Sequence, residues 1–280
     1  MPQPPFSLLK LLETQAPLLG DGSKASVLQE LGFPEKTPPF TANLSHPELV
    51  RQLHKIYSQA GAFLLRTNTE GAYREALESL RLGERAEAVH TTSMALLQEA
   101  AGFQHISVGS ITGIHDPLLT KEDKQQAYAE QIIYLADIGV NLFMLSEFYS
   151  IEELQLALKT VRKVTSKEII VHLTLFPGKQ DSFSSKKLLD LHQFEATYIG
   201  IQGKSEDPQV IQIVQNLIGE CGVISVLLDE PPSMKGEVSL AFQETSRLLM
   251  ESEVAILAGG NYTTPNHIRA LKKIMETMIG

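Results

Sequence analysis

Two acidic residues end apolar segments and are the first candidates for chemistry in this sequence. Asp21 lies in PLLGDG (17–22), and Glu147 ends VNLFMLSE (140–147). Removing a carboxylate from water costs several kcal/mol unless the group is paired or hydrogen-bonded, so each acid needs a partner. A ligand ammonium meets this need. A lysine or arginine of a neighbouring loop, or a helix start that the carboxylate caps, meets it equally well.

Few residues in the sequence are suited to binding a metal ion. Cys221 is the single cysteine, which excludes an intrachain disulfide and any multi-cysteine metal site. Asp229, Asn261 and Tyr262 offer oxygen ligands, and the loop containing His115–Asp116 adds a nitrogen and an oxygen that a harder metal would accept. No His-x3-His or carboxylate–histidine spacing supports such a site. We therefore expect no metal and no cofactor.

Eight short apolar or β-branched segments recur along the chain and would position these residues. Several are almost continuously hydrophobic, which is typical of parallel strands covered on both faces. Amphipathic helical patterns such as HPELVRQLHKIYSQAG separate the segments. The predicted strands are 17–22, 62–69, 105–111, 140–147, 168–175, 197–203, 223–229 and 254–260.

This alternation predicts one (β/α)8 barrel domain spanning residues 1–280. A doubly wound sheet is the alternative, but it would normally use fewer strands and a phosphate-binding glycine loop, and no G-x-G-x-x-G or P-loop pattern is present. Barrels build their sites at the carboxyl ends of the strands. The residues at those ends are Asp21, Asn68, Ser110, Glu147, Thr174, Gln202, Asp229 and Asn261.

Two long connections, 23–45 and 176–186, are expected on the same face, where long loops are usually functional.

Two histidines are assigned structural roles. His172 lies within the fifth predicted strand, so we expect a hydrogen-bonded residue of the barrel interior. His267 is expected to belong to the start of the last helix.

Charge and composition exclude several classes of partner. The net charge is −9 and no run of five like charges occurs, which disfavours binding to nucleic acid or to an anionic membrane. The N-terminal segment MPQPPFSLLKLLETQAP lacks the basic start and long apolar stretch of a targeting or membrane-spanning sequence. We expect a cytoplasmic protein with a small-molecule ligand. A homo-oligomer is possible, because outer barrel helices look alike whether they face water or a second subunit.

The segment ILAGGNYTTPNHI (256–268) resembles the closing signature GGCCGTTPEHI of the homocysteine S-methyltransferase family. Other segments match the family in the same order. LLGDGSKASVLQELG (18–32) is similar to LDGAMGTELQ, the segment ending in RTNTEGA (66–72) is similar to ETNTFGA, and VGSITG (108–113) is similar to GSIGP. LSEFYSIEEL (145–154) resembles a family segment that begins with Glu-Thr. The ordered set identifies the chain as a member of this family.

The resemblance implies a barrel that binds homocysteine. Asp21 and Glu147 would hold its amino group, and the backbone of Gly22 and Ser23 would receive its carboxylate. This agrees with the chemistry, because carboxylates pair with ammonium and the N–H groups of a turn form an anion-binding nest. Two further residues in matching positions, Asn68 and Ser110, would add hydrogen bonds to the substrate, or would instead satisfy loop backbone.

The resemblance also implies zinc held by three cysteine thiolates, and this sequence lacks all three. Gly203, Asn261 and Tyr262 stand at those positions, with the last motif one residue short. Cys221 lies in the helix after the sixth strand, where we expect a buried apolar side chain. Zinc prefers sulfur and nitrogen ligands and converts a bound thiol to a thiolate at neutral pH. The departures therefore predict that zinc-dependent methyl transfer is lost.

Other family positions differ as well. Arg66 replaces a glutamate, Leu228-Asp229 replaces Pro-Asn, and Ala25-Ser26 replaces Gly-Thr. Tyr262 is expected to fill the volume that the zinc site would occupy, with a role as an acid as the alternative.

Three functional hypotheses follow. The first is a homocysteine S-methyltransferase-like barrel, a pseudo-enzyme or one with different chemistry, that binds a small amino acid or a thiol or sulfonium metabolite. The second is ordinary transfer of a methyl group to homocysteine, giving methionine. The third is a non-catalytic regulatory or scaffold protein. We favour the first.

Overall fold

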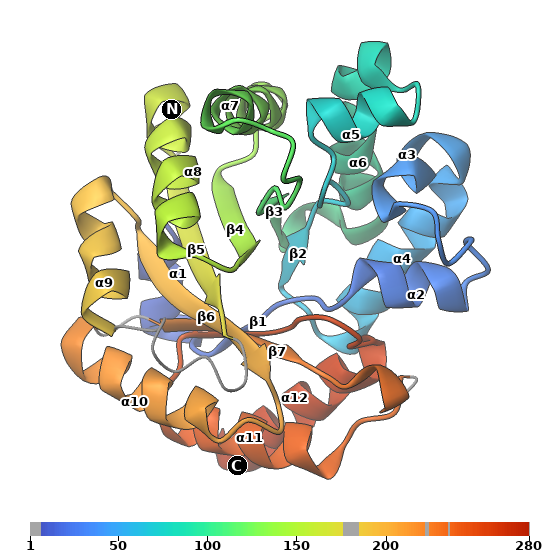
Figure 1. Cartoon of the computed structure of the whole chain (residues 1–280). Coiled ribbons are helices and arrows are strands. Elements are labelled where there is room, and N and C mark those ends of the chain that lie inside the picture. The colour runs from blue at the N-terminus through green and yellow to red at the C-terminus, as the bar shows by residue number, and fades with distance from the viewer. Residues whose placement is uncertain (1–6, 176–184, 222–223, 235, 280) are drawn as a thin grey trace, which may run out of the picture.

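Eight parallel strands form a closed barrel in the computed structural model, which describes residues 7–175, 185–221, 224–234 and 236–279 (Figure 1). The hydrogen-bonded order is β1-β8-β7-β6-β5-β4-β3-β2. A bridge between Gly20 and Leu64 joins β1 to β2 and closes the barrel. The strands are β1 (Leu18–Leu19), β2 (Leu64–Arg66), β3 (Ile106–Thr112), β4 (Leu142–Phe148), β5 (Glu168–Thr174), β6 (Tyr198–Lys204), β7 (Ile224–Asp229) and β8 (Ile256–Gly259).

Helices surround the barrel and connect successive strands (Figure 1). The helices that follow the strands in turn are α4 (Pro47–Ala60), α6 (Ala86–Ala101), α7 (Lys121–Asp137), α8 (Ile151–Val164), α9 (Ser185–Leu189), α10 (Gln209–Cys221), α11 (Leu240–Glu251) and α12 (Pro265–Ile279). Four further helices are α1 (Leu8–Gln15), α2 (Lys24–Glu30), α3 (Ala42–Ser45) and α5 (Arg74–Ser79). The predicted (β/α)8 barrel is confirmed, and each of the eight predicted strand segments overlaps one of its strands, with β3, β4 and β6 ending one residue beyond the prediction.

Alternate side chains along each strand belong to two different cores. Leu142 and Met144 of β4 point into the barrel, where they belong to one apolar cluster with Leu8 and Leu12 of α1. Phe143 of the same strand belongs to the cluster between the sheet and the outer helices. Both faces of the sheet are therefore buried, which explains why the strand segments are hydrophobic without strict alternation.

The sequence overestimated the lengths of β1, β2 and β8, and it missed structure in the connection after β1. In segment 62–69 only Leu64–Arg66 is strand, and the chain then turns into the loop at the mouth of the barrel. The connection 23–45 contains α2, a 3-10 turn at Pro39–Thr41 and α3. Most of the second predicted connection, 176–184, lies outside the described residues.

Gly200 of β6 marks the closest packing inside the barrel and gives a stability prediction. A Cβ at this position would meet the carbonyl oxygen of Ser225 and would lie 2.7 Å from Cδ2 of His172. Replacing Gly200 by alanine is expected to lower the free energy of unfolding by about 1–3 kcal/mol, because the interior cannot expand freely. Urea denaturation followed by circular dichroism measures the change.

Gly219 in α10 provides the matched control, because no atom lies within 4 Å of a Cβ added there. Gly219→Ala is expected to raise the free energy of unfolding by about 0.5–1 kcal/mol through the better helix propensity of alanine. Equal effects of the two substitutions would contradict the packing described for the barrel interior.

Candidate functional site

A cavity of about 210 Å³ opens at the carboxyl ends of the strands. This is the face on which (β/α)8 barrels carry their sites. Most of its lining residues are charged or polar, and they come from the loops after β1, β2 and β8 and from the ends of β2, β3, β4 and β6. The lining residues are Ser23, Ala25, Pro39, Arg66, Glu70, Gly71, Thr112, Ser146, Glu147, Gln202, Gly260 and Asn261.

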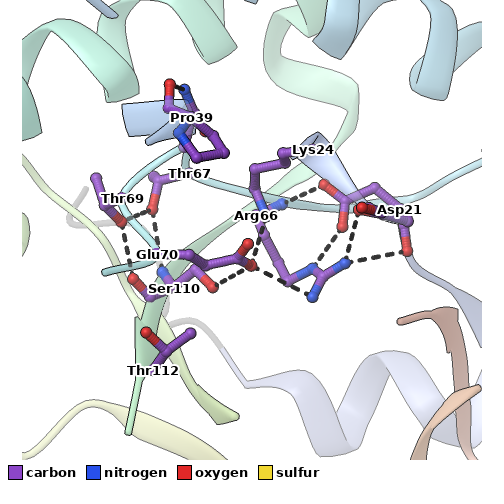
Figure 2. A network of polar contacts seen from close by, with 12 residues as sticks. Asp21, Lys24, Pro39, Arg66, Thr67, Thr69, Glu70, Ser110 and Thr112 are labelled. Atoms are coloured by element: carbon purple, nitrogen blue, oxygen red, sulfur yellow. Dashed lines mark hydrogen bonds and ion pairs between the residues drawn. The ribbon is translucent and has the colours of Figure 1, made fainter. Parts of the chain in front are cut away.

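Asp21 forms a buried ion pair with Arg66 beside this cavity (Figure 2). Arg66 donates from Nε to Oδ1 of Asp21 at 2.6 Å and from its backbone N–H to Oδ2 at 2.9 Å. Asp21 is 1% exposed and does not line the cavity. Of the partners that the sequence left open for this acid, the structure shows an arginine, which comes from the adjacent strand β2.

Arg66 connects three strands at the mouth of the barrel. Its Nη2 donates to the carbonyl oxygens of Gly22 at 2.9 Å and Gly259 at 3.0 Å. Burial by itself would lower the pKa of Arg66, but the carboxylates of Asp21 and Glu70 outweigh burial and raise the pKa above its usual value. The guanidinium is therefore a permanent charge, held by the chain ends of β1, β2 and β8.

Glu70 extends the ion pair into a network of two cations and two carboxylates (Figure 2). Its Oε1 accepts hydrogen bonds from Lys24 Nζ at 2.6 Å and Ser110 Oγ at 2.9 Å, and lies 3.4 Å from Arg66 Nη1. Burial acts to raise the pKa of Glu70, yet Lys24 and Arg66 lower it to about 2. Burial lowers the pKa of Lys24, and the nearby Arg66 charge adds to this effect.

Glu147 lies on the cavity wall in an unusual backbone conformation. The register between β4 and β5 shifts between Leu145 and Phe148, and Glu147 has a φ of +58°, in the left-handed region that non-glycine residues rarely adopt. No residue that the structure describes donates a hydrogen bond to its carboxylate. Burial, together with the charges of Glu70 and Asp229, raises the pKa of Glu147 to about 7.

A hydrogen-bonded cluster joins the ends of β6, β7 and β8. Oδ1 of Asp229 accepts from Gln202 Nε2 at 2.9 Å and from the backbone N–H of Asn261 at 2.6 Å. Gln202 Oε1 accepts from the backbone N–H of Glu147 at 3.3 Å, so the cluster also supports the strained residue. Burial raises the pKa of Asp229 to about 6, although these hydrogen bonds act in the opposite direction.

The three positions at which the family resemblance implies thiolates do not fit zinc. A Cβ at Gly203 would lie 2.7 Å from Val210 Cγ2, so this position faces α10 and not the cavity. Asn261 lines the cavity but offers an amide, and Tyr262 offers a phenol. Within the described residues, no three His, Cys, Asp or Glu side chains gather closely enough to hold a metal ion. These donors are not the sulfur and nitrogen ligands that zinc prefers.

The expectation that Tyr262 fills the cavity is wrong. Tyr262 is 48% exposed and is absent from the cavity lining. Its φ is +61°, in the left-handed region, and its side chain faces solvent. The cavity therefore stays open between Arg66 and Glu147.

The remaining predicted site residues lie at different depths. Ser23 lines the cavity, and its Oγ accepts from the backbone N–H of Ser26 at the start of α2. Gly22 offers its carbonyl oxygen to Arg66. Asn68 donates from Nδ2 to the Pro39 carbonyl at 2.8 Å, which is the loop-supporting role that the sequence allowed. Ser110 reaches Glu70 and not the cavity.

Three histidines singled out in the sequence lie away from the cavity lining. His172 Nε2 is 2.9 Å from Ser225 Oγ inside the barrel, which confirms its predicted structural role. His267 lies in the first turn of α12, as predicted, and accepts a hydrogen bond at Nδ1 from the backbone N–H of Thr264 at 3.0 Å. His115 is exposed, with its ring centroid 4.5 Å from that of Tyr149.

Sequence reasoning did not identify Arg66, Lys24 and Glu70 as one network. A signal was present, because Arg66 and Glu70 are opposite charges four residues apart beside an apolar strand. Lys24 gave no such signal: it reads as an ordinary polar residue of the loop after β1, and only the fold buries it to 1% exposure.

Comparison with known proteins agrees with the order of the motifs and with the fold. The family model described as Homocysteine S-methyltransferase matches residues 18–275. The chain belongs to this family. It is 24% identical to the S-methylmethionine–homocysteine S-methyltransferase of Pongo abelii, over 80% of this chain and 62% of that protein. It is 27% identical to betaine–homocysteine S-methyltransferase 1 of Danio rerio, over 61% of this chain and 44% of that protein.

The chain thus spans less than two thirds of the length of these two relatives of the homocysteine S-methyltransferase family. Its fold matches a solved structure over nearly its whole length. The oxidised form of the homocysteine methyltransferase MmuM from Escherichia coli has a TM-score of 0.81 at 19% identity, covering 95% of this chain and 98% of that chain. The metallated form of the same protein has a TM-score of 0.79.

The helices within the described residues are all too short or too polar to cross a membrane.

The Asp21–Arg66 pair gives a prediction about stability. Arg66→Met leaves a buried carboxylate without its cation, so we expect the free energy of unfolding to fall by about 3–5 kcal/mol. Adding Asp21→Asn to Arg66→Met removes the unpaired charge and is expected to recover part of this loss. Urea denaturation of the wild type, the single variant and the double variant measures both effects. A double variant less stable than Arg66→Met would contradict this account.

The raised pKa of Glu147, about 7, predicts a pH dependence of stability. The unfolded chain releases this proton near the ordinary glutamate pKa of about 4.3, whereas the folded protein retains it to higher pH. The Glu147 contribution to the free energy of unfolding therefore falls as pH rises from about 4.3 through about 7, and the loss is complete above that range.

Glu147→Gln removes this contribution. The free energy of unfolding of the variant minus that of the wild type is expected to increase by about 2 kcal/mol when the pH is raised from about 5 to about 8. Urea denaturation at both pH values checks this. Glu244→Gln, at an exposed position in α11, is the control, and an equal change with pH in both variants would contradict the role given to Glu147.

Proposed function

We propose that this member of the homocysteine S-methyltransferase family binds a small amino-acid-like metabolite in the cavity at the barrel mouth, and that it does not transfer methyl groups through a zinc thiolate. One observation carries the proposal. The acid-lined cavity is open at the carboxyl ends of the strands, while none of the three implied thiolate positions carries a sulfur ligand.

The charges around the cavity support a ligand with a cationic nitrogen. Asp21, Arg66, Lys24 and Glu70 balance one another as two carboxylates and two cations. Glu147 has no cation within this network, and its carboxylate lacks a hydrogen-bond donor from the described residues. A ligand ammonium would supply the missing partner and would favour the ionised carboxylate.

The Asp229–Gln202–Asn261 cluster supports the second part of the proposal, that methyl transfer through a zinc thiolate does not occur. It occupies the ends of β6, β7 and β8, and the implied zinc ligands would have to come from the ends of β6 and β8. Its oxygen and amide groups already bond to one another and to Glu147. The cluster therefore organises this side of the cavity through hydrogen bonds, with a chemistry that does not suit zinc.

Methyl transfer to homocysteine is the second candidate, favoured by the family match over residues 18–275. The names of the relatives indicate S-methylmethionine or betaine as methyl donors for those proteins. Such activity in this chain would require the homocysteine thiol to be activated by groups other than three protein thiolates.

Calorimetric titration with L-homocysteine, L-methionine and S-methylmethionine tests the binding proposal. At about pH 8 most of Glu147 is ionised, and we expect at least one of the three probes to bind the wild type. Glu147→Gln is expected to weaken that binding by about tenfold or more, because a charge-assisted hydrogen bond is lost. Glu244→Gln should leave it unchanged. The proposal fails if no probe binds, or if Glu147→Gln binds as tightly as the wild type.

Metal analysis and an assay for methionine test the claim that the protein does not transfer methyl groups through a zinc thiolate. After equilibration with zinc and removal of free metal, we expect far less than one zinc per chain, and no methionine from L-homocysteine with S-methylmethionine or betaine. Stoichiometric zinc together with methionine formation would establish the second candidate instead.

A further inference from the structure

We propose that Glu70, and not Asp21, is the second acid that faces the ligand beside Glu147, and that Arg66 Nη1 is the facing donor. The cavity would then take a small molecule with a cationic nitrogen next to a hydrogen-bond acceptor. This inference rests on the proposed function, since it concerns the same cavity, and it changes which residues determine specificity there.

Asp21 is fully engaged inside the protein. Both of its carboxylate oxygens accept hydrogen bonds from Arg66, one from Nε and one from the backbone N–H. The side chain of Asp21 is 1% exposed and contributes nothing to the cavity lining. An ammonium group in the cavity would have to displace the Arg66 guanidinium to reach this acid. Arg66 thus occupies the place that a ligand cation would take at Asp21.

Glu70 has the opposite arrangement. Its side chain is 27% exposed and lines the cavity. One oxygen, Oε1, receives Lys24 and Ser110 and lies near Arg66. Within the described residues, no hydrogen bond or ion pair reaches the other oxygen, Oε2. The internal contacts therefore fix the carboxylate through one oxygen and leave the second as an acceptor for a ligand (Figure 2).

Arg66 also has capacity left for a ligand. Nε and Nη2 are used by Asp21, Gly22 and Gly259. In the described part of the chain, the remaining nitrogen, Nη1, has one charged neighbour, Glu70 Oε1 at 3.4 Å, and makes no hydrogen bond. Since Arg66 lines the cavity, Nη1 is a rigidly held donor that a ligand oxygen would satisfy.

Arg66 and Glu70 both stand at positions where this chain differs from the family pattern. The family pattern ETNTFGA is matched here by Arg66-Thr67-Asn68-Thr69-Glu70-Gly71-Ala72, so an arginine replaces the glutamate and a glutamate replaces the phenylalanine. The arginine at position 66 neutralises Asp21. The glutamate at position 70 supplies a new acid on the cavity side. The exchange thus keeps two ligand-facing acids while moving one of them.

The resulting arrangement defines a ligand class. Glu147 and Glu70 Oε2 are acceptors for a primary ammonium or similar cation, and Arg66 Nη1 is a donor for a neighbouring carboxylate or carbonyl oxygen. At about 210 Å³ the cavity is below the range of about 300–1,000 Å³ that is typical of drug-sized ligands. A molecule of amino-acid size with an unmodified amino group meets these requirements.

Calorimetry on the tightest-binding of the three probes named above tests the assignment. Glu70→Gln is expected to weaken binding by about tenfold or more, as Glu147→Gln does. The N-acetyl form of the same probe, which lacks the cationic nitrogen, should bind neither the wild type nor the variants. Binding by Glu70→Gln at wild-type affinity would overturn the inference, even if the proposed function survives.

A second measurement does not depend on any ligand. Carbon NMR titration of the Glu147 carboxyl group reports the charges that face the cavity. Glu70→Gln is expected to lower the pKa of Glu147, because it removes a neighbouring negative charge. The double variant Asp21→Asn with Arg66→Gln removes the internal pair without changing the net charge, and it is expected not to lower that pKa. It avoids the instability of breaking the pair on one side.

The two experiments separate the two claims. If no probe binds the wild type, the proposed function fails, and the NMR titration alone decides whether Glu70 shares the cavity with Glu147. If the double variant lowers the pKa of Glu147 as far as Glu70→Gln does, Asp21 acts on the cavity and the assignment of Glu70 is wrong.

Discussion

The buried pair between Asp21 and Arg66 is the interaction on which the mouth of this barrel depends. It joins β1 to β2 where the barrel closes, and further bonds from Arg66 reach the end of β8. Two charges this deeply buried are stable only when each is matched, so neither can be lost alone. Because the pair is internal, it also decides which acids line the cavity: Asp21 lies outside the lining, whereas Glu70 and Glu147 are part of it.

The opposite side of the cavity is organised by hydrogen bonds centred on Asp229. Asp229 holds Gln202 and the backbone of Asn261, and Gln202 in turn receives the backbone N–H of Glu147. A positive φ at a glutamate is strained and persists only when its surroundings fix it, which is common at functional sites. The cluster provides that support at the strand ends from which, in a zinc-dependent relative, the metal ligands would come. At the positions where the family resemblance implies thiolates, this chain carries Gly203, Asn261 and Tyr262.

Family membership and chemistry therefore depend on different parts of the molecule. The family match depends on the barrel and on the turns that the motifs encode, including the helix start at Thr264 and Pro265. The chemistry depends on a few side chains at the strand ends, and these have changed. A fold supports many reactions by exchanging such residues while its packing is retained.

The sequence by itself determined the eight strands, their covering helices, and the position of Glu147 at a strand end, because hydrophobic periodicity and turn residues act over short distances. It also showed that Gly203, Asn261 and Tyr262 are not thiolates. Only the tertiary structure decided where those side chains point, with position 203 facing α10 and Tyr262 facing solvent.

The ion-pair partner of Asp21 was also determined by the tertiary structure alone. Arg66 lies 45 residues away along the chain and becomes its neighbour only when β1 and β2 close the barrel. Pairing between distant charges depends on strand adjacency and on burial, which no local pattern records. For this reason the sequence placed the candidate site at the end of the barrel where the cavity opens, whereas the fold determined which of its acids line that cavity.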